Sequence, residues 1–135
     1  MGVRMNSPRP DNITLFAPAE RASVESLRSD AALLDASGLL TEVFDQMPHW
    51  IAVANEFRQI VFANRPLRYA IGTNTSAIGL RPGEALGCKN AKHMEGGCGT
   101  AEACRYCGTV NAILENQLSG VLSKKQARIT FASEG

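Results

Sequence analysis

The four cysteines of this 135-residue chain are the side chains best suited to chemistry, and they lie close together in the sequence. They follow the pattern C-x9-C-x5-C-x2-C on and after a glycine-rich stretch, at Cys88, Cys98, Cys104 and Cys107. Four thiolates complete a tetrahedral zinc site or supply every ligand of an iron–sulfur cluster. Two thiols can instead form a reversible disulfide. We therefore expect the chemistry of this chain in the cysteine segment.

Three interpretations of this pattern stay open: a metal or cluster site, a thiol–disulfide switch, and reduced cysteines without chemistry. The spacing matches neither the paired C-x2-C units of a zinc ribbon nor a standard ferredoxin run. Within the metal interpretation we favour an iron–sulfur cluster over zinc, because a redox sensor gives such a site a purpose. His93 lies midway between Cys88 and Cys98 and is a possible further ligand, although a histidine in such a polar loop is more often exposed.

An enzyme is the less favoured function class. The C-x2-C pair of Cys104 and Cys107 is a candidate thiol–disulfide oxidoreductase motif, but that motif normally follows the first strand of a βαβ unit. Here it follows a glycine loop. Glu84 and Glu95 have no evident acid–base partner, so the sequence does not support a hydrolase with a carboxylate pair. We predict no catalytic residue in this chain.

Composition and charge narrow the function classes further. The formal net charge is +1, which predicts no nucleic-acid partner because such a surface needs clustered Lys and Arg. The sequence has neither the apolar stretch of a signal peptide nor a run of about 18 apolar residues, so we predict a cytoplasmic protein without a membrane partner. In that reducing compartment, cysteines are more often metal ligands or redox groups than structural disulfides.

Hydrophobic periodicity predicts the helices and strands that must position the cysteines. Residues 1–12 read as a flexible leader, 13–48 as an N-terminal helical segment, and 49–135 as the main domain. We expect helix from about residue 17 to residue 46, interrupted at Gly38 and ended by Pro48. After Pro48, we interpret His49 as exposed and Trp50 as a core residue.

The remainder of the chain predicts a hairpin, short helices, one longer helix and a strand, which is an α+β arrangement. Residues 51–54 and 59–63 are β-branched runs joined by a loop of hairpin length, and their apolar character predicts burial on both faces. A short helix is expected at 65–71. A longer helix is expected from an N-cap at Thr100 to Gly120, and an alternating strand at 126–131.

Several stretches resemble a PAS domain, the sensory fold of many signalling proteins. The run WIAVANEFRQIVFAN (50–64) is similar to the opening PAS hairpin, which ends in an Asn before the first core helix. Further segments resemble a cysteine-bearing subgroup of PAS domains, which stand at the N-terminus of bacterial sensor histidine kinases. These segments are 16–23, 79–88, 96–100, 104–107 and 108–114. Together these stretches cover roughly residues 14–131.

The resemblance implies a five-stranded antiparallel sheet, in the spatial order 2-1-5-4-3, with flanking helices and a ligand pocket. It implies a sensory domain that passes its signal to a C-terminal kinase or other effector module, with a homodimer formed through the N-terminal helices. Because the chain stops after the third expected strand, we expect a fragment or a degenerate member with unpaired sheet edges. An organic ligand, or a purely dimerising role with incidental cysteines, is the alternative function.

Overall fold

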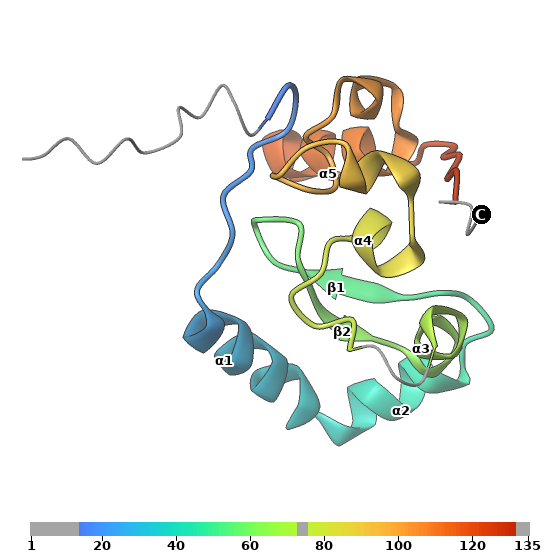
Figure 1. Ribbon diagram of the computed structural model, residues 1–135. Helices are drawn as coiled ribbons and strands as arrows, with labels where there is room; N and C mark the ends of the chain where they lie inside the picture. Colours follow the sequence, from blue (N-terminus) through green and yellow to red (C-terminus); the bar gives the residue numbers. More distant parts are fainter. Residues whose placement is uncertain (1–13, 73–75, 132–135) are drawn as a thin grey trace, which may run out of the picture. The chain divides into compact units, whose positions relative to one another are not determined.

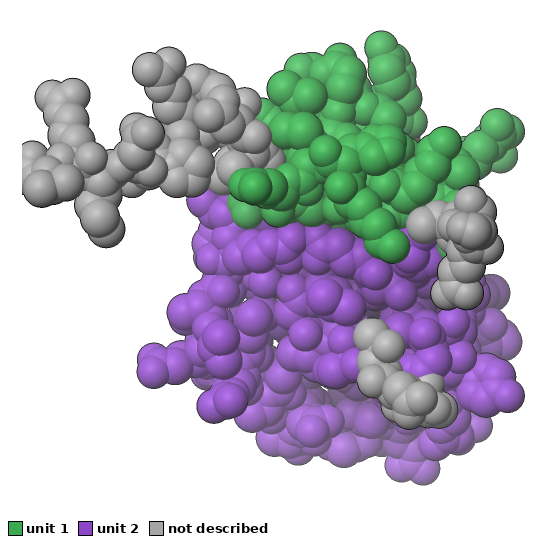
Figure 2. All heavy atoms as spheres, viewed as in Figure 1, with its two compact units in different colours: residues 1–19, 88–135 green, residues 20–87 purple. Residues whose placement is uncertain are grey.

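The computed structural model describes residues 14–72 and 76–131 (Figure 1). The chain divides into two compact units, coloured in Figure 2: unit 1 comprises residues 1–19 and 88–135, and unit 2 comprises residues 20–87. The described residues form an α+β structure with one two-stranded antiparallel sheet, which confirms the predicted class. The predicted leader, residues 1–12, lies outside the described residues.

Unit 2 contains, in chain order, α1 (Val24–Asp35), α2 (Gly38–Gln46), β1 (Ala52–Ala54), β2 (Ile60–Ala63), α3 (Arg65–Ile71) and α4 (Pro82–Leu86). The described residues of unit 1 contain two 3-10 helices and one α-helix: η2 (Lys89–Lys92), η3 (Glu102–Tyr106) and α5 (Gly108–Ser119).

Two helices precede the hairpin, as the periodicity predicts, but their limits differ from the prediction. The first helix begins only at Val24, because the Ser23 side chain accepts a hydrogen bond from the Ser26 amide and caps the helix there. The interruption lies at Ala36 and Ser37, and Gly38 is already the first residue of α2. Helix α2 ends at Gln46, immediately before the residue that precedes Pro48.

The hairpin of β1 and β2 is antiparallel, with Ala52 opposite Ala63 and Val53 opposite Phe62, and this prediction is confirmed. Burial differs between the two strands. Every residue of β2 is buried, whereas the two alanines of β1 are exposed. The prediction of coverage on both faces is therefore correct for β2 and wrong for β1. Trp50, next to this uncovered strand, is 56% exposed, so its interpretation as a core residue is also wrong.

Helix α3 follows the hairpin directly and has the predicted limits. Asn64 is its N-cap, Pro66 stands in its first turn, and Gly72 ends it with φ +108°. Its one fully buried residue, Leu67, joins the hydrophobic core of unit 2. That core consists of Ile60, Ala63, Leu67 and Ala77, with Ile71, Ala85 and Leu86 packed against it.

In unit 1 the longer helix starts later than predicted. Thr100 is not its N-cap, because the Thr100 hydroxyl donates to the Gly97 carbonyl oxygen at 2.6 Å. The chain then forms the 3-10 helix η3, and α5 begins at Gly108 after an extended Cys107. The predicted end at Gly120 is confirmed by its left-handed φ of +70°.

The predicted strand at 126–131 is not formed. Residues 126–130 are irregular and mostly exposed, and the segment is joined to the rest of unit 1 by one isolated bridge between Cys88 and Phe131. The Lys89 amide donates to the Thr130 carbonyl oxygen at 2.8 Å beside that bridge. The described part of unit 1 contains no strand with which residues 126–131 could pair. They therefore form only the isolated bridge to Cys88 and no continuous strand pairing.

Candidate functional site

All four predicted site cysteines lie in unit 1, within the described residues, and none forms a disulfide. Cys88 precedes η2, and Cys98 lies in the glycine loop that precedes η3. Cys104 is inside η3 and buried, and Cys107 links η3 to α5. The other three thiols are half-buried, so each retains some access to solvent.

The structure brings Cys104 and Cys107 together in one turn. The Cys107 amide donates to the Cys104 carbonyl oxygen at 3.1 Å, which closes an i to i+3 turn of η3. Side chains three residues apart in a 3-10 helix lie one above the other. The backbone between these two thiols is thus already folded into a short turn, the arrangement that a C-x2-C disulfide requires.

The structure does not bring three or more of the predicted ligands into a metal-binding group. Among the described residues, no cluster of three His, Cys, Asp or Glu side chains could hold a metal ion. His93, the possible fifth ligand, follows η2 and is exposed. A four-cysteine site would therefore require Cys88 and Cys98 to rearrange with respect to the Cys104–Cys107 turn.

The cysteine unit buries mainly small side chains. Its buried non-glycine residues in the described part are Ala17, Thr100, Ala101, Cys104 and Val110. Val110 is the largest apolar member of that group, whereas hydrophobic side chains usually dominate the interior of a stable domain. Small units with little apolar burial commonly depend on a disulfide or a metal ion for stability.

Backbone geometry determines the shape of the loop that carries Cys98. Gly97 and Gly99 flank this cysteine with φ of +84° and +90°, values that non-glycine residues rarely adopt. The same loop binds the start of unit 1, since the Leu15 amide donates to Thr100 at 2.7 Å and the Ala17 amide to Gly99 at 3.0 Å. The Cys98 loop and residues 14–17 are therefore joined by backbone hydrogen bonds.

Arg105 reinforces the same connection from η3. Its guanidinium donates to the Leu15 carbonyl oxygen at 2.6 Å and lies 5.5 Å from the centre of the Phe16 ring. It also pairs with Glu102 at 3.0 Å. Because Arg105 lies inside the C-x2-C motif, a change in the Cys104–Cys107 turn would act directly on residues 14–17.

Asn64 is the central polar residue of unit 2. Its side chain is fully buried and makes four hydrogen bonds: Oδ1 accepts from the amides of Ile51 and Leu67, and Nδ2 donates to the carbonyl oxygens of Phe44 and His49. One side chain therefore connects the end of α2, the hairpin and the start of α3. The sequence analysis noted Asn64 only as the end of the hairpin; an Asn two residues before a Pro is the N-cap signal that could have identified its capping role.

Glu84 has a structural role in unit 2. Its carboxylate accepts two hydrogen bonds from Arg21 and one from the Arg81 amide, at the start of α4. Arg81 is itself fully buried and donates to the carbonyl oxygens of Phe57 and Glu20. These contacts are those of a helix cap.

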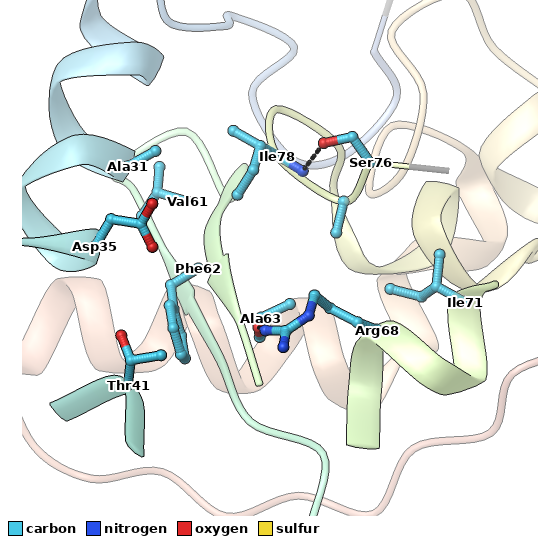
Figure 3. A pocket seen from close by; sticks show the side chains of 11 residues that line it. Ala31, Asp35, Thr41, Val61, Phe62, Ala63, Arg68, Ile71, Ser76 and Ile78 are labelled. Carbon is cyan, nitrogen blue, oxygen red and sulfur yellow. Dashed lines mark hydrogen bonds between the residues drawn. The ribbon is translucent and has the colours of Figure 1, made fainter. Parts of the chain in front are cut away.

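Unit 2 also contains a cavity of about 390 Å³ (Figure 3); the PAS resemblance implies a ligand pocket, but it identifies none of the lining residues. It is bounded by residues from α1, α2, β2 and α3 and from the segment that follows α3: Ala31, Asp35, Thr41, Val61, Phe62, Ala63, Arg68, Ile71, Ser76, Ala77 and Ile78. No cysteine lines it. The lining residues come from five separate segments, so no single stretch of the sequence could have identified them.

Comparisons with known proteins leave the family open. No family model, no curated protein and no solved structure matches this chain. In the described ranges, the helices are too short or too polar to span a membrane. The geometry of units 1 and 2 therefore carries the functional argument that follows.

Proposed function

We propose that this chain is a non-catalytic sensory module of a bacterial signalling protein, with PAS-like character, that responds to redox conditions through its cysteines. The observation that carries the proposal is the location of all four thiols in a unit that buries mainly small side chains. In such a unit, linking or releasing two segments has a large effect on stability. Cysteine chemistry could then switch unit 1 between a more stable and a less stable conformation.

The simplest switch is a disulfide between Cys104 and Cys107, which share one turn of η3. With a peroxide as oxidant, one thiolate attacks the peroxide oxygen, which yields a sulfenic acid and releases hydroxide or alkoxide. The second thiol then displaces the sulfenic oxygen as water, and the S–S bond forms. Two thiols lose two electrons and two protons, and the peroxide is reduced by the same two electrons.

The metal version of the proposal uses the same residues. Four thiolates from Cys88, Cys98, Cys104 and Cys107 would bind zinc or an iron–sulfur cluster, and loss or oxidation of the metal would release the loop. The glycines around Cys98 support this version, because a loop rich in glycine changes conformation at low cost. Both versions place the sensing step in unit 1.

Chain connectivity supports a route from sensing to output. The Cys98 loop and Arg105 bind residues 15–17, and the chain continues from there to α1, which begins at Val24. A change in the Cys104–Cys107 turn would therefore alter the segment that precedes the N-terminal helices. In the proposed module those helices form a homodimer and pass the signal to an attached kinase or other effector.

Two measurements on the full chain test the proposal. Anaerobic purification followed by absorption spectroscopy and iron and zinc analysis tests the metal version; we expect stoichiometric metal if it is correct. Exposure of metal-free protein to hydrogen peroxide, with thiol counting and mass spectrometry, tests the disulfide version. We expect loss of two thiols per chain, located at Cys104 and Cys107, with full recovery by dithiothreitol.

Variants separate this chemistry from nonspecific oxidation. The substitutions Cys104→Ser and Cys107→Ser should each prevent the reversible loss of two thiols, whereas Cys88→Ser should leave it intact. A protein that binds no metal anaerobically and forms no reversible intramolecular disulfide would overturn the proposal.

A further inference from the structure

The cavity of unit 2 combines an apolar wall with a few polar groups, as small-molecule sites commonly do. Its volume of about 390 Å³ lies within the usual range for ligand pockets. Phe62, Ile71 and Ile78 supply apolar surface, and Ala31 and Ala77 leave space because their side chains are short. The cavity therefore fits a compact organic molecule with an apolar body.

Two polar groups in the cavity lack a partner. Asp35 is an exposed residue whose carboxylate has no hydrogen bond or ion pair within the described ranges, and Figure 3 shows its two oxygens directed toward Val61 and Phe62. The Thr41 hydroxyl oxygen is buried and has no hydrogen-bond partner among the described residues. A buried hydroxyl normally has a partner, so a ligand group at this position would complete it.

The other charged group at the cavity is already occupied. The Arg68 guanidinium donates to the Ala63 carbonyl oxygen at 2.6 Å and lies 3.6 Å from the Asp45 carboxylate, which Arg65 also approaches at 3.7 Å. The Ser76 hydroxyl also has a partner, since it accepts from the Ile78 amide at 3.3 Å. Asp35 is therefore the charged lining residue that has no hydrogen-bond or ion-pair partner among the described residues.

We propose that this cavity binds a small organic amine, whose ammonium group donates to Asp35 and Thr41 and whose aromatic or branched body packs against Phe62, Ile71 and Ile78. The ammonium group supplies donors to a carboxylate that has none, and a hydrogen bond between two charged groups is stronger than a neutral one. An aromatic body suits the Phe62 ring, since aromatic pairs gain energy beyond their buried area. The inference is independent of the sensor proposal, because every lining residue belongs to unit 2 and no cysteine takes part.

Three probes of nearly equal shape test the charge preference: 2-phenylethylamine, 2-phenylethanol and 3-phenylpropanoate. Each is titrated into the full chain and followed by two-dimensional amide NMR. We expect saturable binding of the amine, weaker binding of the alcohol and the weakest binding of the carboxylate. The shifted amides should belong to residues that line the cavity, from α1, α2, β2 and α3.

Matched variants on α1 test the location. Asp35→Asn should weaken amine binding by about three- to tenfold and leave alcohol binding unchanged, while Asp30→Asn, which lies outside the cavity, should change neither. Ala31→Leu should fill the space and abolish binding of both probes, while Ala32→Leu on the exposed side should preserve it. Absence of saturable amine binding, equal affinity for the three probes, or unchanged binding to Ala31→Leu would each overturn the proposal.

Discussion

Units 1 and 2 bury different kinds of residue. Unit 2 has an apolar cluster around Ile60 and Leu67, and its buried Asn64 and Arg81 hold separate segments together through named hydrogen bonds. Unit 1 buries alanine, threonine and one valine, and its loop conformation depends on glycines and backbone hydrogen bonds. Unit 2 therefore has its own means of stabilisation, whereas unit 1 has few besides its four thiols. Under the proposed function, this contrast makes the cysteines the groups through which the stability of unit 1 is controlled.

The largest effect should come from Asn64→Ala in unit 2. The substitution removes the hydrogen bonds to the Ile51 and Leu67 amides and to the carbonyl oxygens of Phe44 and His49, of which Phe44 keeps one from the Met47 amide; each group that water cannot reach costs about 1–3 kcal/mol. We expect a loss of about 3–5 kcal/mol in the free energy of unfolding, measured by urea titration. Asn64→Asp keeps the accepting oxygen and loses only the donated bonds, so it should fall between the alanine variant and the unsubstituted chain.

Hydrogen exchange of the Asn64→Ala variant sharpens the comparison between the units. We expect amides of α2, β1, β2 and α3 to lose protection, because Asn64 joins the segments that contain them. Protection in α5 should change less, since unit 1 contains none of the lost hydrogen bonds. Equal loss of protection in both units would show that their stabilities are not separate.

The second effect concerns Gly108, the first residue of α5. A methyl group here would lie about 2.6 Å from the Gln126 carbonyl carbon, so the backbone at 126–127 would have to move. We expect Gly108→Ala to cost about 2–3 kcal/mol despite the better helix propensity of alanine. Gly38→Ala is the control in unit 2, because a methyl group there meets nothing within 4 Å and alanine should stabilise α2 by up to about 1 kcal/mol.

The limits of several helices could be predicted from single residues in the sequence. Local signals were sufficient for some elements: the short helix expected at 65–71, before Gly72, has these limits in the structure, where Asn64 is its N-cap. Gly120 likewise predicted the end of α5. The sequence predicts an interruption at Gly38, whereas the structure has it at Ala36 and Ser37. Gly38 is the first residue of α2, a position where a helix tolerates glycine.

Features that depend on distant segments were beyond the sequence. The pattern at 126–131 is that of a strand, but a strand needs a partner, and the bridge at Cys88 is the pairing that the described part of unit 1 provides. Thr100 is a residue type that often caps helices, but its hydroxyl donates a hydrogen bond to the Gly97 carbonyl oxygen instead. The cysteines could be found from their spacing, whereas the shared turn of Cys104 and Cys107, and the absence of a three-ligand group among the described residues, require the three-dimensional structure.

The third effect tests the dependence of unit 1 on its thiols. Closing the short loop between Cys104 and Cys107 removes entropy from the unfolded chain worth about 2 kcal/mol. We expect peroxide-oxidised protein to resist urea more than reduced protein by about that amount, with the gain confined to the exchange protection of η3 and α5. Cys107→Ser should remove the difference. An oxidised chain that is less stable than the reduced one would indicate strain in the turn and would reverse the direction of the proposed switch.

The smallest effect is the pH response of Glu115, on α5. A hydrogen bond from Lys125 at 2.9 Å, followed by one from Ser123 at 2.9 Å, lowers the pKa of Glu115 below its ordinary value of 4.5. Because the folded pKa lies below the unfolded one, the stabilisation is present above the unfolded pKa and is lost as the pH falls through the folded pKa. The protection of the amides at 120–125, corrected for the intrinsic pH dependence of exchange, should therefore fall as the pH drops below 4.5. Glu115→Gln should show the faster exchange already at neutral pH, whereas Glu42→Gln on α2 should not, which would place the acid response in unit 1 alone.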